Sequence, residues 1–298
     1  MNRVLVTGCP RSGTTFVGSV LASAPRVAYL HEPLNPDCGL PSASHRFADL
    51  ADPSSAAVAD EMLELFELRG RLRGNVYPTD TAIVRLGKRL VAGRGPLQLA
   101  KARALPRREH VVVKDPFAMR SIEWFEAQGC TVIVMVRHPA AVVASMRRLG
   151  WKAGTTMRRF AAEGLLDDVE LDWVDQLDAD LDGVALFWRM NYRAALAGLG
   201  DGRLVVHELM SARPSEAIAE LRAATGIPWS DRSERRLRRL TSGDVAAADP
   251  AGRTQQFRRA SADILGSTIS TLTADELDRI WAIAGDIASR WYRPDGLT

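Results

Sequence analysis

Five short runs of apolar, largely β-branched residues occur along the chain. They are Val4–Val6, Val27–His31, His110–Val113, Cys130–Val136 and Arg203–Val206. Within each run the apolar positions are nearly continuous instead of alternating with polar ones, which is typical of strands buried on both faces. The pattern therefore predicts the buried strands of a parallel sheet.

The segments between these runs have apolar residues at helical spacing. The first helix should stop before Pro25, because a residue that precedes proline avoids the helical region. A last helix should begin at the capping box Thr273–Glu276 and pack its apolar positions on the body of the protein. That first helix covers about Thr14–Ala24. The other predicted helices cover about Ser121–Gln128, Pro139–Leu149 and Val184–Leu196, with a further one from Pro214.

This alternation of strands and helices predicts an α/β fold, a three-layer sandwich with a central parallel sheet and helices on both faces. The sequence contains no repeat and no low-complexity linker, so we expect a single domain over residues 1–298. We interpret residues 42–108 and 154–182 as helical insertions or lids. The acidic part of the second, residues 163–182, predicts either a helix with a charged outer face or a mobile flap.

Composition and charge narrow the kinds of partner. The chain is 46% apolar and 25% charged, as in ordinary globular proteins, and its net charge is only +3. Because a nucleic-acid surface needs clustered basic charge, this balance favours an anionic ligand in a local pocket and no nucleic acid. The three cysteines and five histidines lack metal-ligand spacing, so we expect no metal and a cytoplasmic setting. No apolar run is long enough to predict an integral membrane segment.

The most informative polar segment is Thr7–Thr15, TGCPRSGTT, which lies between the first predicted strand and the first predicted helix. A glycine-containing loop at such a junction presents backbone N–H groups to an anion, and the helix dipole adds positive potential. The spacing is that of a Walker A loop, but Thr14 stands in place of the lysine and Arg11 supplies the cation. The loop therefore predicts phosphate binding without triphosphate–metal chemistry.

A second phosphate-binding pattern follows the fourth predicted strand. Arg137 ends the strand, Pro139 opens a helix, and Ser145 lies about two turns along that helix. Arginine binds phosphate bidentately, and the serine hydroxyl would lie on the same side. Together with Pro10–Thr15, this pattern resembles the two phosphate-binding elements of P-loop sulfotransferases, which use 3′-phosphoadenosine-5′-phosphosulfate (PAPS). The likeness is nearest to the tyrosylprotein and carbohydrate branches and covers about Leu5–Arg148.

The resemblance implies a P-loop-type nucleotide-binding core with PAPS as co-substrate. In that family the loop binds the 5′-phosphosulfate, here with the N–H groups of Ser12–Thr15, and the arginine–serine element binds the 3′-phosphate. The residues that the resemblance assigns to PAPS are Arg11, Ser12, Gly13, Thr14, Thr15, Arg137 and Ser145.

Two charged residues follow predicted strands at the edge where parallel sheets bind ligands. The resemblance implies that Glu32 is the general base and that Lys114, in a Lys-Asp-Pro segment, contacts the transferring group together with Arg11. Cytosolic sulfotransferases use histidine as the base, and His31 adjoins Glu32. Because neighbours at a strand end point to opposite sides, we expect only one of them at the site and choose Glu32.

The implied reaction moves the sulfuryl group from PAPS to an acceptor hydroxyl, or an amine, with no metal. The sequence leaves the acceptor open, and a small molecule, sugar, lipid or peptide would fit. A P-loop kinase for a small metabolite is the first alternative, disfavoured by the missing Walker lysine. A non-catalytic PAPS-fold binding protein is the second, disfavoured by the presence of Glu32 and Lys114. A loose likeness to a cofactor-binding loop at Arg258–Ser261 carries no assignment.

Overall fold

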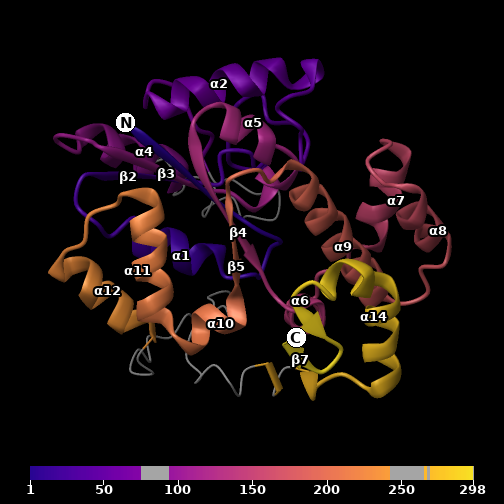
Figure 1. Ribbon diagram of the computed structural model, residues 1–298. Coiled ribbons are helices and arrows are strands. Elements are labelled where there is room, and N and C mark those ends of the chain that lie inside the picture. The colour runs from indigo at the N-terminus through magenta and orange to yellow at the C-terminus, as the bar shows by residue number, and fades with distance from the viewer. Residues whose placement is uncertain (75–93, 242–264, 267–268, 298) are drawn as a thin grey trace, which may run out of the picture.

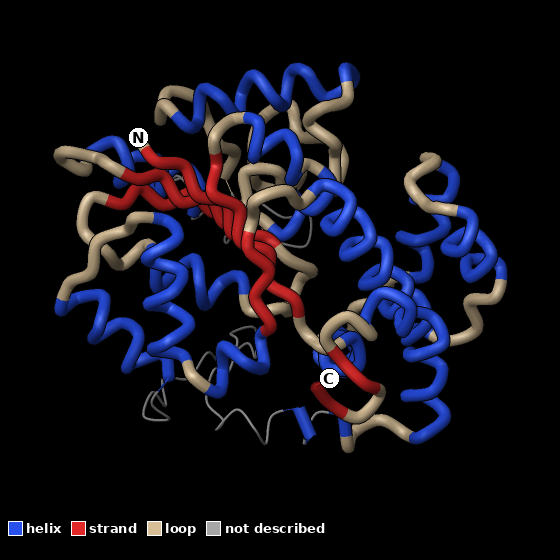
Figure 2. Tube along the Cα trace, in the orientation of Figure 1, coloured by secondary structure: helices blue, strands red, loops and turns tan. Residues whose placement is uncertain are grey.

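The computed structural model of this protein describes residues 1–74, 94–241, 265–266 and 269–297 (Figure 1). Within these residues a five-stranded sheet has the order β2-β3-β1-β4-β5, and every neighbouring pair is parallel (Figure 2). This confirms the predicted α/β class with a central parallel sheet. The strands are β1 (Asn2–Thr7), β2 (Val27–His31), β3 (His110–Lys114), β4 (Cys130–Val136) and β5 (Arg203–Val206).

The predicted helices are present, with ends that differ by a few residues, and several others lie between them. The helices before β4 are α1 (Thr14–Leu21), α2 (Ala56–Phe66), α4 (Arg94–Ala104) and α5 (Ile122–Ala127). Those after it are α6 (Pro139–Arg148), α7 (Gly154–Ala162), α8 (Asp168–Asp175), α9 (Asp180–Gly198), α10 (His207–Ala212), α11 (Pro214–Thr225), α12 (Asp231–Thr241) and α14 (Ala274–Ala288). A small antiparallel hairpin, β6 (Tyr292–Arg293) and β7 (Gly296–Leu297), follows α14.

Alternate side chains of each strand enter two separate apolar cores, one on each face of the sheet. Val4 and Val6 of β1 pack with residues of α1, α11 and α12. Leu5, between them, packs with residues of α2, α5 and α9 on the opposite face. Because both faces are covered, every position of β1 from Val4 to Thr7 is buried. This is the physical reason that the strand sequences are continuously apolar.

The parallel register brings the carboxyl ends of the strands to one edge. Val6 of β1 and His31 of β2 both lie opposite Lys114 of β3. After β1 the chain continues into α1 on one face, whereas after β4 it continues into α6 on the other. A change of face between adjacent strands opens a crevice at their carboxyl ends. The carboxyl ends of β1 and β4 are therefore the expected ligand site.

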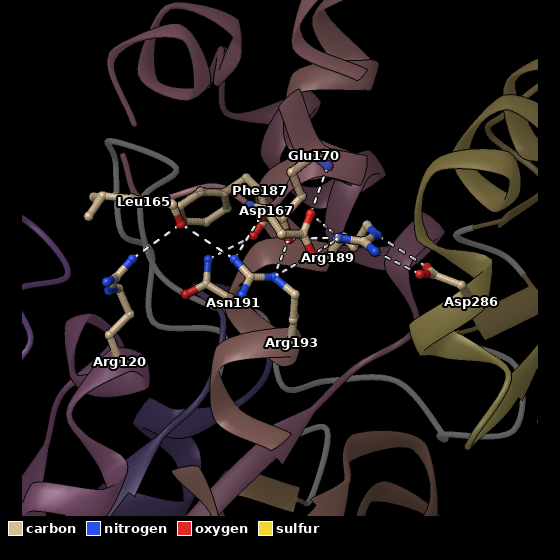
Figure 3. Close-up of polar contacts among 9 residues, drawn as sticks. All are labelled: Arg120, Leu165, Asp167, Glu170, Phe187, Arg189, Asn191, Arg193 and Asp286. Atoms are coloured by element: carbon tan, nitrogen blue, oxygen red, sulfur yellow. Dashed lines mark hydrogen bonds and ion pairs between the residues drawn. The ribbon is translucent and has the colours of Figure 1, made fainter. Parts of the chain in front are cut away.

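The acidic segment 163–182 forms α8 and the start of α9, and part of its charge faces inward. Arg189 of α9 lies 2.8 Å from Glu170 of α8 and 2.8 Å from Asp286 of α14 (Figure 3). Arg193 lies 2.8 Å from the other oxygen of Glu170, which is wholly buried. Of the two predictions for this segment, the helix and not the mobile flap is observed. Glu170 points inward and not outward, because two arginines of α9 form ion pairs with its carboxylate.

Replacing Arg189 with methionine is expected to lower the free energy of unfolding by about 3 kcal/mol, because a buried carboxylate loses a charged partner. The midpoint of urea unfolding at an unchanged m-value measures the loss. Arg238→Met is the matched control, because its ion pair with Glu234 on α12 is exposed and should contribute less than about 1 kcal/mol. Equal losses in the two variants would contradict a structural role for the buried pair.

Candidate functional site

The loop between β1 and α1 has a backbone that only particular residues adopt. Gly8 has a φ of 147° and Gly13, the N-cap of α1, a φ of 98°. A Cβ on Gly8 would lie 2.4 Å from the carbonyl oxygen of Met135, and one on Gly13 would lie 2.7 Å from the His207 ring. Both positions therefore require glycine. The close approach holds the loop against β4 and against the end of β5.

Fewer backbone N–H groups are available to an anion than the sequence predicts. The Ser12 N–H donates to the carbonyl oxygen of Cys9 at 3.0 Å, so it closes the turn. Gly13, Thr14 and Thr15 form the start of α1, where N–H groups have no acceptor in the preceding turn. The cradle expected over Ser12–Thr15 is thus reduced to these three groups and the dipole of α1.

The two predicted phosphate-binding elements meet at the carboxyl ends of β1 and β4. The Nε of Arg11 donates to the Ser145 hydroxyl at 3.0 Å, and an Nη of Arg137 donates to the carbonyl oxygen of Arg11 at 3.0 Å. Arg11 itself has a φ of 76°, in the left-handed region that non-glycine residues rarely adopt. Segments more than 100 residues apart in sequence therefore form one site.

Positive charge at this site is concentrated and only partly compensated. Burial lowers the pKa of Arg11, and the neighbouring charges of Arg137 and Arg148 lower it further. The Nε of Arg137 is buried and has no hydrogen-bond partner among the residues that the structure describes. A half-buried guanidinium whose buried Nε is a free donor suits a multiply charged anion. Arg148 was missed from the sequence, although its position one turn beyond Ser145 on α6 could have indicated it.

The predicted base and the predicted lysine form an ion pair. Glu32 follows β2, and one of its carboxylate oxygens lies 2.6 Å from the Nζ of Lys114, the last residue of β3. The other oxygen accepts a hydrogen bond from the Asn35 side chain at 2.9 Å. The lysine side chain is 4% exposed and the glutamate side chain 19%, so the pair is largely shielded from solvent and the carboxylate is the more accessible partner.

The environment of Glu32 favours the ionised form. Burial raises the pKa of Glu32, but the Lys114 ammonium, the His31 ring and hydrogen bonds from Lys114 and Asn35 together lower it below its ordinary value. The carboxylate is therefore negatively charged at neutral pH, which is the form that accepts a proton.

The expectation that His31 and Glu32 point to opposite sides is wrong. The Nε2 of His31 lies 3.5 Å from the Glu32 carboxylate, and its Nδ1 lies 3.2 Å from the Tyr29 hydroxyl. Glu32 has a φ of 53°, which ends the alternation of side chains that an extended strand would have. Both residues lie at the site, and Glu32 is the one that contacts Lys114.

Asp115 and His207 also lie at strand ends, although no role for them was predicted from the sequence. Asp115, wholly buried, accepts hydrogen bonds from the backbone N–H groups of Leu34 and Phe117, and so ties the Glu32 loop to the end of β3. Burial and the charge of Glu32 raise the pKa of Asp115 to about 7. His207, directly after β5, packs beside Gly13, and burial together with Arg137 lowers its pKa to about 3. The His207 ring is therefore neutral. Its position directly after the fifth predicted strand is the sequence feature that could have indicated a residue of the site.

Some features of the chain lie outside this site. Residues Arg258–Ser261 are not among the described residues. In the described part of the chain no helix has the length and apolarity to cross a bilayer. The same residues contain no group of three or more histidine, cysteine or acidic side chains arranged to hold a metal ion.

The fold and the site together define an α/β protein with a loop-to-helix junction and an arginine cluster suited to an anionic ligand. A model of the Sulfotransferase family matches residues 3–231, and the chain belongs to the sulfotransferase family. A search of curated proteins found no match.

Solved sulfotransferase structures share low sequence identity with this chain. The sulfotransferase domain from the curacin biosynthetic pathway is 15% identical, with a TM-score of 0.49 over 97% of this chain and 97% of that one. The sulfotransferase domain of the Synechococcus PCC 7002 olefin synthase is 16% identical, with a TM-score of 0.46 over 96% and 94%. Sulfotransferase STF9 from Mycobacterium avium is 15% identical, with a TM-score of 0.47 over 99% and 78%.

Proposed function

We propose that this sulfotransferase transfers the sulfuryl group of PAPS to an acceptor hydroxyl, or to an amine. One observation supports the proposal most strongly. The contacts of Arg11 with Ser145 and Arg137 join two phosphate-binding elements, and the Glu32–Lys114 pair lies at the ends of the neighbouring strands of the sheet. Two proposed anion sites beside an ionised carboxylate would suit a donor with two phosphates and a transferable group.

The donor would be held at both of its phosphates. The N–H groups that open α1, with Arg11, would bind the 5′-phosphosulfate. Arg137 would bind the 3′-phosphate through its free Nε, and Ser145 would assist. The Ser145 hydroxyl accepts a hydrogen bond from Arg11, so its own proton is still available for a phosphate oxygen.

In the proposed reaction the acceptor oxygen attacks sulfur while the bond from sulfur to the 5′-phosphate oxygen breaks. Glu32 takes the proton of the acceptor, and the products are the sulfated acceptor and 3′,5′-adenosine bisphosphate. Negative charge develops on the sulfuryl oxygens and the departing phosphate. Lys114, Arg11 and the N–H groups of residues 13–15 would stabilise that charge.

Lys114 would interact with the base, Glu32, before the donor binds and with the sulfuryl group afterwards. In the ligand-free site it contacts Glu32 at 2.6 Å and lowers the pKa of that carboxylate, which weakens it as a base. A sulfuryl group near Lys114 would draw the ammonium toward itself. Burial would then raise the pKa of Glu32, so the carboxylate becomes a stronger base when the donor is bound.

Ligand-dependent stability tests the donor. We expect 3′,5′-adenosine bisphosphate at about 100 times its Kd to add about 2.7 kcal/mol to the free energy of unfolding, and ATP with Mg²⁺ to add nothing. Thermal unfolding measures both effects. Arg137→Ala should abolish most of the gain, whereas Arg238→Ala, on the exposed face of α12, should not. Stabilisation by ATP–Mg²⁺ alone would favour the kinase, and stabilisation by neither ligand would reject the donor.

A further inference from the structure

The peptide bond between Arg137 and His138 is held from two directions. Its carbonyl oxygen, that of Arg137, accepts a hydrogen bond from the Trp188 indole of α9 at 2.8 Å. Its N–H, that of His138, donates to the carboxylate of Glu208 on α10 at 3.2 Å. The starting point of the Arg137 side chain is therefore determined by helices far along the chain, in addition to β4.

Glu208 is in turn held by the C-terminal hairpin. The hydroxyl of Tyr292, on β6, donates to the second carboxylate oxygen of Glu208 at 2.7 Å. Both residues are buried, with Glu208 8% and Tyr292 1% exposed. Burial raises the pKa of Glu208 above its ordinary value, and the Tyr292 hydrogen bond, the Arg137 charge and the His138 N–H only partly oppose this rise. Glu208 is thus a buried acceptor beside Arg137, held by the Tyr292 hydroxyl and the His138 N–H together.

The same hairpin makes a second contact at this point. The Nδ1 of His138 accepts from the Ala140 N–H, so its Nε2 carries the proton and donates to the carbonyl oxygen of Arg293 at 2.9 Å. The Tyr292 ring meets the His138 ring edge-on, with 5.0 Å between centroids. The hairpin therefore lies against the start of α6, as Figure 1 shows.

We propose that Glu208 and Tyr292 are positioning residues for Arg137, and that the C-terminal hairpin thereby sets the preference of the site for ligands with a 3′-phosphate. The proposal rests on the proposed function, in which Arg137 binds that phosphate. A bidentate guanidinium–phosphate contact depends on orientation, so a shift of about 1 Å at the base of the arginine weakens it. The free, buried Nε of Arg137 is the donor whose direction is at stake.

Tyr292→Phe isolates this effect, because it removes one hydroxyl and keeps the ring against His138. Without that donor Glu208 has an unsatisfied buried oxygen, and its hold on the His138 N–H weakens. We expect the affinity for 3′,5′-adenosine bisphosphate to fall about tenfold, with the affinity for 5′-AMP, which lacks the 3′-phosphate, unchanged. Calorimetric titration of the full chain with each nucleotide gives the ratio of the two affinities.

A merely structural hairpin would not change this ratio. Arg293→Ala is the matched control, because it alters an exposed side chain of the same hairpin and keeps the carbonyl that His138 uses; its ratio should equal that of the wild type. Arg137→Ala gives the ratio expected when the 3′-phosphate contact is lost. An unchanged ratio in Tyr292→Phe, or an equal loss for both nucleotides, would overturn the proposal. A wild-type protein that binds both nucleotides equally would overturn the 3′-phosphate site itself, a result visible without any variant.

Discussion

Replacing Glu32 with glutamine is expected to lower kcat for sulfuryl transfer by about 10²–10⁴-fold while 3′,5′-adenosine bisphosphate binds normally. Glutamine keeps the size of the side chain and can still hydrogen-bond to Asn35, but it cannot take the proton of the acceptor. The proposed phosphate-binding residues lie in the loops after β1 and β4 and on the helices that follow these loops, away from this substitution. The effect should therefore fall on turnover and not on donor affinity.

The measurement is the rate of transfer from PAPS to an acceptor found in a screen of hydroxyl compounds. Glu109→Gln is the matched control, because Glu109 is an exposed carboxylate just before β3, at the opposite edge of the sheet, and its kcat should not change. Near-normal turnover in Glu32→Gln would remove Glu32 as the base. His31, whose Nε2 is 3.5 Å from the Glu32 carboxylate, would then be the base to test by substitution.

Replacing Lys114 with methionine is expected to lower the rate of the chemical step by about 10²–10³-fold. The substitution removes the ammonium that would stabilise charge on the sulfuryl oxygens. Methionine retains most of the aliphatic stem, which packs so closely on α1 that a Cβ at Gly18 would lie 3.0 Å from the Cβ of Lys114. A single-turnover experiment with bound PAPS measures the chemical step, and an unchanged rate would reject the role.

The same variant should change the pH dependence in a defined direction. In the wild type the Lys114 charge opposes the effect of burial and lowers the pKa of Glu32. Without that charge burial prevails, so the pKa of Glu32 rises and the carboxylate becomes protonated at a higher pH. The acid side of the kcat/KM profile, which reports groups of the free enzyme, should therefore move upward in pH. Lys101→Met, on the exposed face of α4, should leave both the rate and the profile unchanged.

The buried charge network away from the site has a different role. Arg189 and Arg193 hold α8 against α9, and Asp286 joins α14 to them (Figure 3). α9 also carries Trp188, whose indole holds the carbonyl oxygen of Arg137. The acidic segment is thus anchored, through its buried Glu170, to the helix that supports the proposed phosphate site.

The sequence by itself determined the five strands of the parallel sheet, the class of fold and the two patterns that predict phosphate binding. Strands buried on both faces must be apolar at nearly every position, so the run Cys130–Val136 is recognisable without its neighbours. The turn at Gly8 and Gly13 needs glycine for reasons of backbone angle and space, so it too leaves a local signal. These features depend on residues close together in the chain.

Only the tertiary structure decided which charged and polar side chains contact one another. The Lys114–Glu32 pair joins residues 82 apart in sequence, the Arg11–Ser145 contact joins residues 134 apart, and the Tyr292–Glu208 contact joins residues 84 apart. Such contacts follow from strand order, from register and from left-handed residues such as Arg11 and Glu32. A one-residue change at a strand end reverses the side on which a side chain lies, and no local pattern of polar and apolar residues records that change.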